Sequence, residues 1–421
     1  MQISIFVLIF VSSQAPIVMI QEFQVANFFS IRERININFL PSSDDRMLEY
    51  YTHQVKPGLR LLKVGIIYGA NASGKTTVLN AISFFRDFMV VSPSDKLKGL
   101  DYSPFMLDNE SRTRNSFMEM TFFIDGEKYV VSAEFNSRFV VFEQLTVYAS
   151  SRPALLYKRQ YSEDTGHSVV SFGQKIGLSK KSMRAIEGNI TNNCSVMAAF
   201  GRTNVEASRL DKVFRYFSEH MLDMLYPRLP IMDYVKRELR NAPDDSVKSF
   251  ILQILRASDF NIVDFYTSNM DDSTSSEELI FRHSGDGDEF SLDEKFESAG
   301  TRRFLAMAII LYKLIHRNCF LPVDEIETSI HYELFSYFIK VFLANSEGSS
   351  QLLMTTHDIN LLDEDFIRRD VIWFTVKDAK GATSIKRLSA SGLHKTMSAY
   401  NAYRQGKVVE LPFLGSIFLD D

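Results

Sequence analysis

The chain has 421 residues, of which 45% are hydrophobic and 24% charged, and its formal net charge is −5. This composition is typical of a globular protein with two or three domains, and it excludes a collagen-like, disordered or strongly basic chain. The two cysteines, Cys194 and Cys319, lie far apart and form no Cys/His cluster, so a reducing cytoplasm is expected and no disulfide framework or zinc site is predicted.

Residues 1–18 are interpreted as an N-terminal extension. The apolar run from Ile3 to Val11 is too short to span a bilayer, and no positively charged residue precedes it as in a signal peptide. A mistaken start, with Met19 as the better first residue, is favoured over secretion. We therefore expect a cytoplasmic protein that does not bind a membrane.

The first lobe is expected to span residues 19–150. Alternating apolar residues predict two strands within 20–40, and the polar stretch 41–60 is predicted to be a loop. A phosphate-binding loop follows. Its sequence, Gly-x-x-x-x-Gly-Lys-Thr from Gly69 to Thr76, lies between a strand-like apolar run and a helical pattern that extends to about Val90.

The chemistry of this loop follows from its residue types. Glycines permit backbone angles that turn consecutive N–H groups toward one anion, and the start of the helix adds its positive dipole end. Lys75 is expected to reach the β- and γ-phosphates, and the Thr76 hydroxyl to bind Mg²⁺. The predicted nucleotide-binding residues of the loop are Gly69, Asn71, Ala72, Ser73, Gly74, Lys75, Thr76 and Thr77.

Antiparallel strands are predicted after the helix, at 117–124, 128–135 and 139–148, with a hairpin turn at Asp125-Gly126. Residues 151–290 are expected to form an insertion that is mainly helical. It contains a hairpin at 155–172, apolar stripes of helical spacing at 205–226 and 246–257, a loop at 268–278, and a turn at 284–288 between two short strands.

The second lobe is expected to span residues 291–421 and carries three further signals. Ser298-Ala299-Gly300 precedes a helix predicted over 305–316, and a hydroxyl with flexible backbone N–H groups at a helix start can bind an anion. The alternative for Ser298 is a simple helix cap.

Asp324-Glu325 ends the apolar run 319–323, a Walker B pattern in which Asp324 would hold Mg²⁺ and Glu325 would polarise the attacking water. Pro322 is unexpected there, because it cannot donate a hydrogen bond within a central strand.

The third signal is His357, which ends a strand predicted at 352–356 and would contact the γ-phosphate. The C-terminal segment from 371 is predicted to contain a strand pair and a helix at 389–403. It carries no nuclease constellation, and Asp420-Asp421 is interpreted as a solvated end.

With these motifs in this order, the chain from Met19 onward resembles a prokaryotic AAA-family (ABC-type) ATPase head of abortive-infection and antiphage defence systems. It is similar to the ATPase part of overcoming-lysogenization-defect nucleases and of PARIS- and Septu-type proteins. The matching pieces are 69–76, 104–108, 125–129, 297–302, 324–331, 355–358, 369–374 and 403–406. Two departures are that no Q-loop glutamine is assigned, and that Tyr332 follows His331 where the family often has proline.

The resemblance implies binding of ATP and Mg²⁺, with two heads that sandwich the nucleotide in a head-to-tail homodimer. It implies that Ser298 and Gly300 are the signature facing the partner's γ-phosphate, and that His357 is the switch histidine. The expected fold is α/β, a P-loop NTPase of ABC-ATPase head type, with a mixed sheet, an antiparallel β-subdomain and a helical insertion. Because only about 250 residues separate Lys75 from Asp324, long coiled-coil arms are not expected.

The expected function is an ATPase, converting ATP and water to ADP and phosphate, with Glu325, His357 and Lys75 as catalytic residues. It would act as a sensor or scaffold that controls a separately encoded effector, a nuclease or toxin, in antiviral defence. The alternatives are a self-sufficient DNA repair or recombination ATPase and a non-hydrolysing nucleotide-gated assembly protein. DNA-stimulated turnover would favour the first alternative, and tight ATP binding without turnover the second, so binding of nucleic acid stays open.

Overall fold

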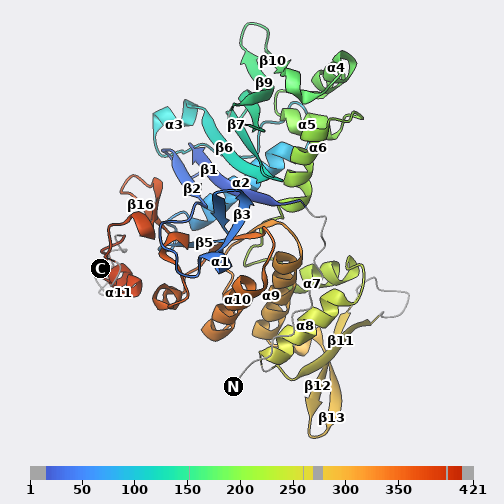
Figure 1. The fold of residues 1–421 in the computed structure, drawn as a ribbon, viewed down its shortest axis with the longest axis vertical. Coiled ribbons are helices and arrows are strands. Elements are labelled where there is room, and N and C mark those ends of the chain that lie inside the picture. Colours follow the sequence, from blue (N-terminus) through green and yellow to red (C-terminus); the bar gives the residue numbers. More distant parts are fainter. Residues whose placement is uncertain (1–15, 151, 259, 269–277, 395–396, 410–421) are drawn as a thin grey trace, which may run out of the picture. The chain divides into compact units, whose positions relative to one another are not determined.

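The computed structural model describes residues 16–150, 152–258, 260–268, 278–394 and 397–409. They form two compact units, which we describe one at a time (Figure 1). The P-loop unit contains residues 16–224, 319–325 and those from 349 on, and the second unit contains 225–318 and 326–348. The predicted extension 1–18 lies largely outside the described residues.

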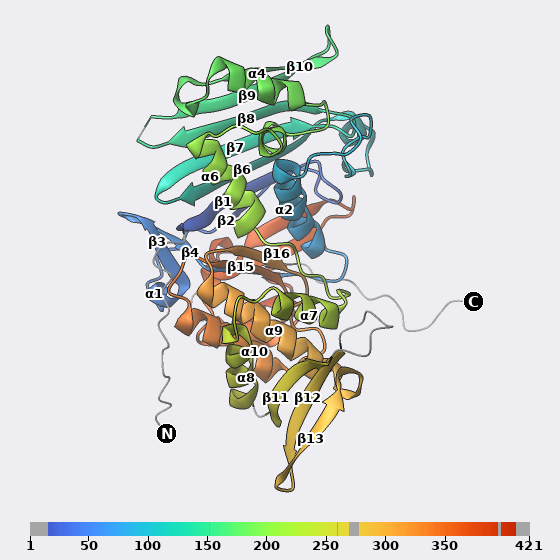
Figure 2. The ribbon, with the colours of Figure 1, turned by 90° about the vertical axis from the view of Figure 1, so that its right-hand side faces the viewer.

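A five-stranded sheet in the order β14-β15-β5-β16-β17 carries the P-loop (Figure 2). Its first four strands are parallel, and β17 is antiparallel to β16. Every residue of β5, β14 and β15 is buried, as expected for parallel strands covered on both faces. The strands are β5 (Val64–Tyr68), β14 (Phe320–Val323), β15 (Gln351–Thr355), β16 (Ile372–Lys377) and β17 (Thr383–Arg387).

Pro322 is accommodated because β14 lies at the edge of this sheet, so the expectation of a central strand was wrong. Neighbouring residues of a strand direct their backbone groups to opposite sides. The carbonyl of Phe320 accepts from Leu222 N on the outer side, so Pro322, two residues on, also directs its nitrogen away from β15.

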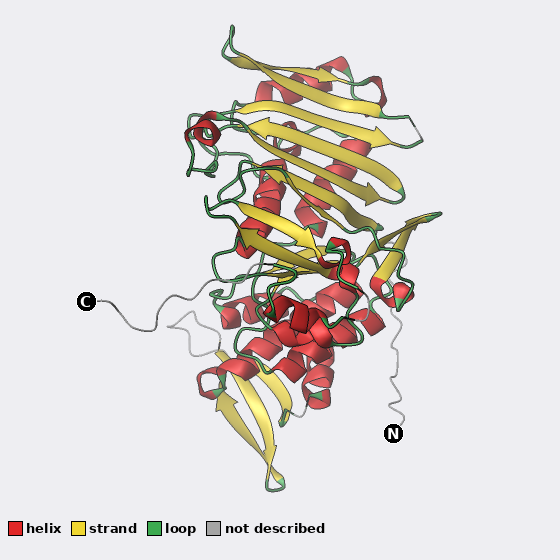
Figure 3. Ribbon diagram, turned by 90° about the vertical axis from the view of Figure 1, so that its left-hand side faces the viewer, coloured by secondary structure: helices red, strands yellow, loops and turns green. Residues whose placement is uncertain are grey.

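A seven-stranded antiparallel sheet, in the order β10-β9-β8-β7-β6-β1-β2, forms the other half of the P-loop unit (Figure 3). Asp125 and Gly126 have φ angles of 48° and 80°, the left-handed conformations of a tight hairpin turn between β6 and β7. The predicted strands and both predicted hairpins of this region are confirmed. The strands are β1 (Val18–Ala26), β2 (Ile35–Asn38), β6 (Ser116–Ile124), β7 (Glu127–Phe135), β8 (Val140–Tyr148), β9 (Ala154–Ser162) and β10 (His167–Phe172).

Helix α2 (Lys75–Val90) follows the P-loop and buries an apolar stripe at helical spacing. Within that stripe, the Phe85 ring lies 5.8 Å from Phe23 of β1 and 6.2 Å from Phe217. These contacts anchor the helix whose first turn closes the P-loop. The other helical elements of this unit are α1 (Leu48–Tyr51), α3 (Asn109–Thr113), η1 (Gln174–Ile176), α4 (Lys180–Asn189), α5 (Val196–Gly201), α6 (Ser208–Arg215), η2 (Tyr216–His220), η4 (Ile359–Asp363), η5 (Arg369–Val371), η6 (Leu388–Ala390) and α11 (Ala399–Arg404).

Three local predictions for this unit were wrong. Residues 41–60 are not a loop throughout, since they contain α1 and much of the hairpin of β3 (Thr52–Lys56) and β4 (Leu59–Leu62), whose turn places Gly58 at φ 78°. The helix predicted at 389–403 is reduced to α11, and Gly392 adopts a left-handed φ of 75°. The stripe at 205–226 is helical only to His220, because the chain then extends and Met221 pairs with Phe320.

In the second unit, α9 (Ala299–His316) is the central helix, packed against α7 (Ile231–Arg240), α8 (Ser246–Ala257) and α10 (Tyr332–Asn345). Helix α9 begins at Ala299, before its predicted start at Leu305. Helix α8 matches the apolar stripe predicted at 246–257. A three-stranded antiparallel sheet of β11 (Ile262–Ser268), β12 (Glu278–Gly285) and β13 (Asp288–Asp293) completes the unit, with η3 (Glu294–Phe296) after it. The loop predicted at 268–278 lies mostly outside the described residues.

The expected fold class is confirmed: the protein is α/β, with a parallel P-loop sheet and a separate antiparallel sheet. The predicted boundaries after residues 150 and 290 fall inside the P-loop unit and the second unit, respectively. The segment 151–290 contains the helices α4 to α8 and also strands β9 to β12 and the start of β13. Within the described part of the chain, no helix combines the length and apolar character needed to cross a bilayer.

Candidate functional site

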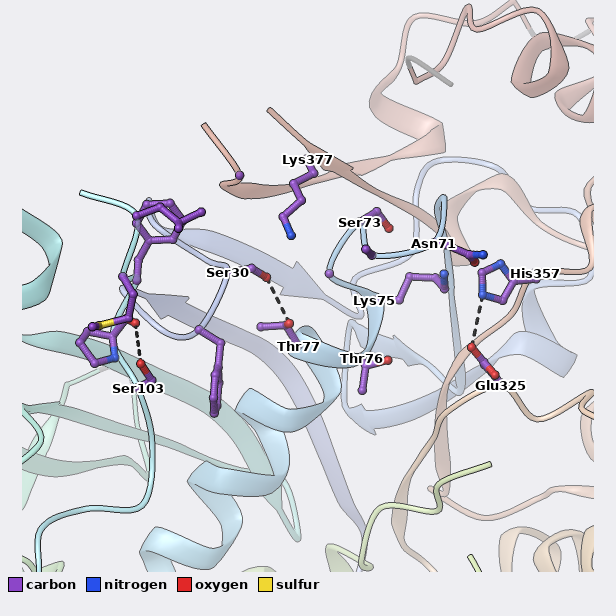
Figure 4. A pocket seen from close by; sticks show the side chains of 18 residues that line it. Ser30, Asn71, Ser73, Lys75, Thr76, Thr77, Ser103, Glu325, His357 and Lys377 are labelled. Atoms are coloured by element: carbon purple, nitrogen blue, oxygen red, sulfur yellow. Dashed lines mark hydrogen bonds and ion pairs between the residues drawn. The ribbon is translucent and has the colours of Figure 1, made fainter. Parts of the chain in front are cut away.

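A pocket of about 730 Å³ opens at the carboxyl ends of the parallel strands in the P-loop unit (Figure 4). It contains nine of the sequence-predicted site residues, including Glu325 and His357. The residues that line it are Phe29, Ser30, Asn71, Ala72, Ser73, Gly74, Lys75, Thr76, Thr77, Ser103, Pro104, Phe105, Met106, Leu107, Glu325, His357, Lys377 and Gly381.

The left-handed backbone predicted for both P-loop glycines is confirmed for Gly74, whereas Gly69 is required by close packing, and Ala72 is the other left-handed residue of the loop, with a φ of 61°. Gly74 has a φ of 104°, and a Cβ on it would lie 2.2 Å from the Thr383 Oγ1 atom. A Cβ on Gly69 would lie 2.3 Å from the Thr375 Oγ1 atom. Neither position can therefore take a side chain without displacing β16 or β17.

Lys75 is 5% exposed and lies inside this loop. Its ammonium donates to the Gly69 carbonyl at 3.0 Å and to the Ala70 carbonyl at 3.3 Å. The loop thus holds the lysine charge at the N-terminus of α2, where the helix dipole also favours an anion.

A hydrogen-bonded chain joins the ends of three elements. The Thr76 hydroxyl donates to Asp324 Oδ2 at 2.9 Å, and the Thr355 hydroxyl donates to Asp324 Oδ1 at 2.6 Å. The Thr355 hydroxyl also accepts from the Glu325 N–H at 2.9 Å. Strand β15 therefore fixes both acids that follow β14.

Glu325 and His357 face each other at the mouth of the pocket. Glu325 Oε1 lies 3.3 Å from His357 Nε2, and the two side chains are 37% and 38% exposed (Figure 4). Glu325 has a φ of 45°, a left-handed conformation that is uncommon for a residue with a side chain. Such strain is concentrated at functional sites, and Glu325 lines the pocket directly after the end of β14.

Gly69 and Asp324 do not line the pocket themselves, but together with its lining residues they fit a nucleotide and Mg²⁺. The hydroxyl of Thr76 and the carboxylate of Asp324 are hard oxygen donors, the type that Mg²⁺ prefers, and they lie within hydrogen-bond distance of each other. Lys75 and the start of α2 supply the positive charge that phosphates require. Among the described residues, no group of three or more His, Cys, Asp or Glu side chains is placed to hold a metal.

Ser298 and Gly300 belong to the second unit and are not among the residues that line the pocket. Ser298 caps α9, with its hydroxyl accepting from the Thr301 N–H at 2.9 Å. A Cβ on Gly300 would lie 3.1 Å from the Ser329 carbonyl oxygen, so a glycine is favoured here by close packing.

One end of the pocket is not marked by any sequence motif. No role was predicted for the lining residues outside the motifs, although 104–107 had been noted in the family resemblance. Lys377 ends a strand next to β5, but this signal is usable only when the order of the strands is known. The missed lining residues are Phe29, Ser30, Ser103, Pro104, Phe105, Met106, Leu107, Lys377 and Gly381.

Solved structures similar to this chain include three SMC head domains. The head from Thermotoga maritima has 12% identity and a TM-score of 0.43, over 87% of this chain and 98% of that one. An SmcHead bound to the C-winged helix domain of ScpA has 12% identity and a TM-score of 0.44, over 88% and 98%. The Pyrococcus furiosus head with an extended coiled coil, bound to the C-terminal domain of ScpA, has 11% identity and a TM-score of 0.43, over 92% and 98%.

These scores lie below 0.5, so they assign no site or partner to this chain. No curated protein matches its sequence. A family model described as "AAA domain, putative AbiEii toxin, Type IV TA system" matches residues 66–363, from the P-loop strand to beyond His357. The match spans more than half of the chain, and the protein therefore belongs to this AAA-domain family.

Proposed function

We propose that this protein binds Mg²⁺-ATP in the P-loop pocket and hydrolyses it to ADP and phosphate. The observation that carries the proposal is the chain of hydrogen bonds from Thr76 through Asp324 and Thr355 to Glu325. It joins a phosphate-binding loop and a candidate base, which line the pocket, to a candidate magnesium-binding acid beside it.

Each residue has a distinct role in this proposal. Bound Mg²⁺-ATP supplies the phosphoryl group and a metal that neutralises its charge. Lys75 holds the β- and γ-phosphates, and Thr76 and Asp324 hold the metal. Glu325 accepts a proton from the attacking water, and His357, 3.3 Å from Glu325, orients that carboxylate and contacts the γ-phosphate.

Ser298 and Gly300 complete the site of a second copy in a head-to-tail homodimer. Ser298 already lies at the N-terminus of the 18-residue helix α9, a position that favours anions. A site shared in this way makes turnover depend on assembly.

The role proposed for this ATPase is that of a cytoplasmic sensor or scaffold that controls a separate effector in antiphage defence. The family description, which names an AbiEii toxin and a type IV toxin–antitoxin system, supports an association with such systems. Purified alone, the chain is then expected not to cleave DNA or RNA.

Complementation between two inactive variants tests both halves of the proposal. Lys75→Ala should bind ATP at least tenfold more weakly, since the phosphates lose the only lysine charge in the loop. Ser298→Arg should bind ATP normally but fail to assemble and turn over, because bulk and charge then obstruct the start of α9.

A mixture of the two variants should recover part of the turnover, because one site of the mixed dimer retains both intact halves. Turnover, ATP affinity and light scattering are measured for each variant and for the mixture. Normal ATP binding by Lys75→Ala would refute the nucleotide site, whereas an active, assembling Ser298→Arg protein would refute only the shared site.

A further inference from the structure

The pocket extends beyond the proposed phosphate site. In Figure 4, Glu325 and His357 lie at one end of the labelled side chains, and Ser103 lies at the other. Its volume of about 730 Å³ is within the range of roughly 300–1,000 Å³ that is usual for small-molecule sites. Phosphates held at Lys75 would therefore leave room for the rest of a nucleotide toward Ser103.

Exposed apolar side chains gather at this far end. Phe29, Met106 and Leu107 are 43%, 46% and 67% exposed, yet all three line the pocket. We call the end formed by Phe29, 103–107 and Gly381 the base end. Apolar and aromatic surface in a concave site is the usual lining for a flat organic ligand.

Phe29 is held in this position by its surroundings. Its φ of 47° is left-handed, an uncommon conformation for a bulky residue. The Phe29 N–H donates to the Ser103 carbonyl at 2.8 Å, and the buried Asn27 side chain accepts from the Phe105 N–H at 3.0 Å. The connection after β1 and the segment 103–107 thus form one preformed wall, which maintains the strained aromatic residue at the pocket.

Two polar groups of the base end are already engaged with protein groups. The Ser103 hydroxyl donates to the Pro104 carbonyl at 3.1 Å, and the Met106 carbonyl accepts from Arg112 Nε at 2.9 Å. The described lining residues of this end include no Asp, Glu, Asn or Gln side chain that could recognise the edge of a base. Binding there would depend on stacking, which every base provides according to its area.

A second cation lies between the two ends. Lys377 lines the pocket, and its ammonium has no hydrogen-bond or ion-pair partner among the residues that the structure describes. In Figure 4 it extends toward Ser30, whose hydroxyl donates to Thr77 at 3.1 Å. Thr77 immediately follows the predicted magnesium ligand, so this charge is placed next to the P-loop on the side of the base end.

We propose that the base end is a nucleoside subsite for purine nucleoside triphosphates, with the base stacked on Phe29 between Met106 and Leu107. Lys377 contacts the phosphate nearest the ribose. Because stacking rather than edge recognition holds the base, the site accepts ATP and GTP almost equally and binds the smaller pyrimidines more weakly. This subsite rests on the proposed binding of phosphates at the P-loop.

Equilibrium binding of ATP, GTP, CTP and inorganic tripolyphosphate to the full chain tests the subsite, because tripolyphosphate has no base. ATP and GTP should bind within about threefold of each other, and CTP about fivefold more weakly. Phe29→Ala should weaken ATP and GTP binding by about tenfold and leave tripolyphosphate binding unchanged. Lys377→Gln should weaken ATP and tripolyphosphate binding alike, by about threefold to tenfold.

Tyr50→Ala and Lys380→Gln are matched controls, since both side chains are exposed in the same unit and neither lines the pocket. Both should bind every ligand as the wild type does. If Phe29→Ala does not fold, Phe29→Leu serves instead, because it keeps an apolar side chain and loses the ring face.

Wild-type affinity of a folded Phe29 variant for ATP, or a preference of more than about thirtyfold between ATP and GTP, would overturn the subsite. Failure of the proposed function looks different: neither ATP nor tripolyphosphate would then respond to Lys75→Ala. If both respond to Lys75→Ala while Phe29 has no effect, only the nucleoside subsite is wrong.

Discussion

Two polar networks in the P-loop unit differ in what they face. The site network opens on a pocket, since Glu325 and His357 are each more than one-third exposed. The internal network is closed, since the side chains of Glu143 and Arg159 are both 0% exposed. Members of the site network are Thr76, Asp324, Glu325, Thr355 and His357, and members of the internal network are Glu143, Tyr157, Arg159 and the backbone of 191–196.

The internal network joins buried side chains of two strands to the backbone of the segment 191–196. Glu143 accepts from the Tyr157 hydroxyl at 2.7 Å and from the Val196 N–H at 2.9 Å, and it lies 4.0 Å from Arg159. Arg159 donates to the Thr191 carbonyl at 3.0 Å, which fastens the segment before α5 to the sheet. Burial raises the pKa of Glu143 and lowers the pKa of Arg159, because each charged form is removed from water.

A perturbed, buried charge is not by itself a sign of catalysis, since structural ion pairs also shift pKa values. A buried charge whose partners are all buried protein groups stabilises the fold. A catalytic group must also be accessible to its substrate. Asp324 combines both features, since it is 5% exposed and hydrogen-bonded, yet lies between Thr76 and Glu325 at the pocket.

Replacement of Glu325, the partly exposed carboxylate of the site network, should have the largest effect on turnover. Glu325→Gln keeps the size of the side chain but removes the base, so ATP turnover should fall by about 100- to 10,000-fold. Thermal unfolding should change little, because the side chain is partly exposed. ATP should remain bound, and the dimer should accumulate as bound nucleotide favours it.

Glu163→Gln, an exposed change elsewhere in the same unit, is the control and should leave turnover unaltered. Near-normal turnover of a folded Glu325→Gln protein would show that Glu325 is not the catalytic base. The proposed distinction between the site network and the internal network would then be wrong.

Disrupting the internal network should lower the stability of the fold and leave turnover unchanged. Arg159→Met leaves the buried Glu143 without its cation, so the free energy of unfolding should fall by about 3–5 kcal/mol, as measured in urea. Turnover per folded molecule should stay close to the wild-type value. The double variant Arg159→Met, Glu143→Leu removes the orphaned charge and should recover much of the loss.

A loss of turnover in Arg159→Met without a loss of stability would mean that the internal network serves the reaction and not the fold.

The site network was largely predictable from sequence because its residues are marked by local context. Thr76, Asp324 and His357 each lie beside a recognisable strand or helix pattern. Parallel strands bring their carboxyl ends to one edge of a sheet, so residues distant in sequence meet there. Thr355 was not assigned a role, because its hydroxyl matters only once β15 lies beside β14.

Other features depend on tertiary contacts that no local pattern contains. Glu143 and Arg159 lie in polar stretches of β8 and β9, Glu143-Gln144 and Lys158-Arg159-Gln160, and resemble solvated strand positions until the segment 191–196 contacts them. The helix expected to continue past His220 ends because Met221 pairs with β14. The base end could not be predicted from the sequence either, since the segments that contain Phe29, 103–107 and Gly381 come together only in the folded chain.

Thr355 is predicted to act by positioning Asp324 and Glu325 rather than by contacting the ligand itself. Thr355→Val keeps the shape but removes the hydroxyl that donates to Asp324 and accepts from the Glu325 N–H. Turnover should fall by about threefold to tenfold, corresponding to about 1 kcal/mol, and more Mg²⁺ should be needed for half-maximal rate. Thr355→Ser retains the hydroxyl and should restore both values.

An unchanged Mg²⁺ requirement in Thr355→Val, with turnover reduced, would place the effect on Glu325 alone.

A third polar cluster, around Asp370, provides the test with the smallest expected effect. Its charges are buried like those of the internal network, and the Ser42 hydroxyl donates one hydrogen bond to them. The buried carboxylate of Asp370 accepts from Arg368 Nη2 at 2.6 Å, from the Ser42 N–H at 2.7 Å and from the Ser42 hydroxyl at 2.9 Å. Burial alone would raise the pKa of Asp370, but these hydrogen bonds and the Arg368 charge outweigh it and lower the pKa below its usual value. A carboxyl group with a lowered pKa stabilises the folded state above its unfolded pKa of about 3.9, and this contribution is lost as the pH falls through the folded pKa.

Arg368 Nε also donates to this carboxylate, at 3.0 Å, so Ser42→Ala removes one of four hydrogen bonds, and the free energy of unfolding should fall by about 0.5–1.5 kcal/mol at pH 7. The unfolded chain titrates alike in both proteins, so the difference from the wild type should shrink as the pH falls through the lowered folded-state pKa of Asp370. Urea unfolding at pH 7, 5, 3.5 and 2.5 measures this, with Ser391→Ala, whose hydroxyl donates to the Leu388 carbonyl, as a serine control without a carboxylate partner. A Ser42→Ala effect that stays constant across this range would show that the hydroxyl stabilises the fold independently of the Asp370 charge, and the closed clusters would then act through packing and neutral hydrogen bonds.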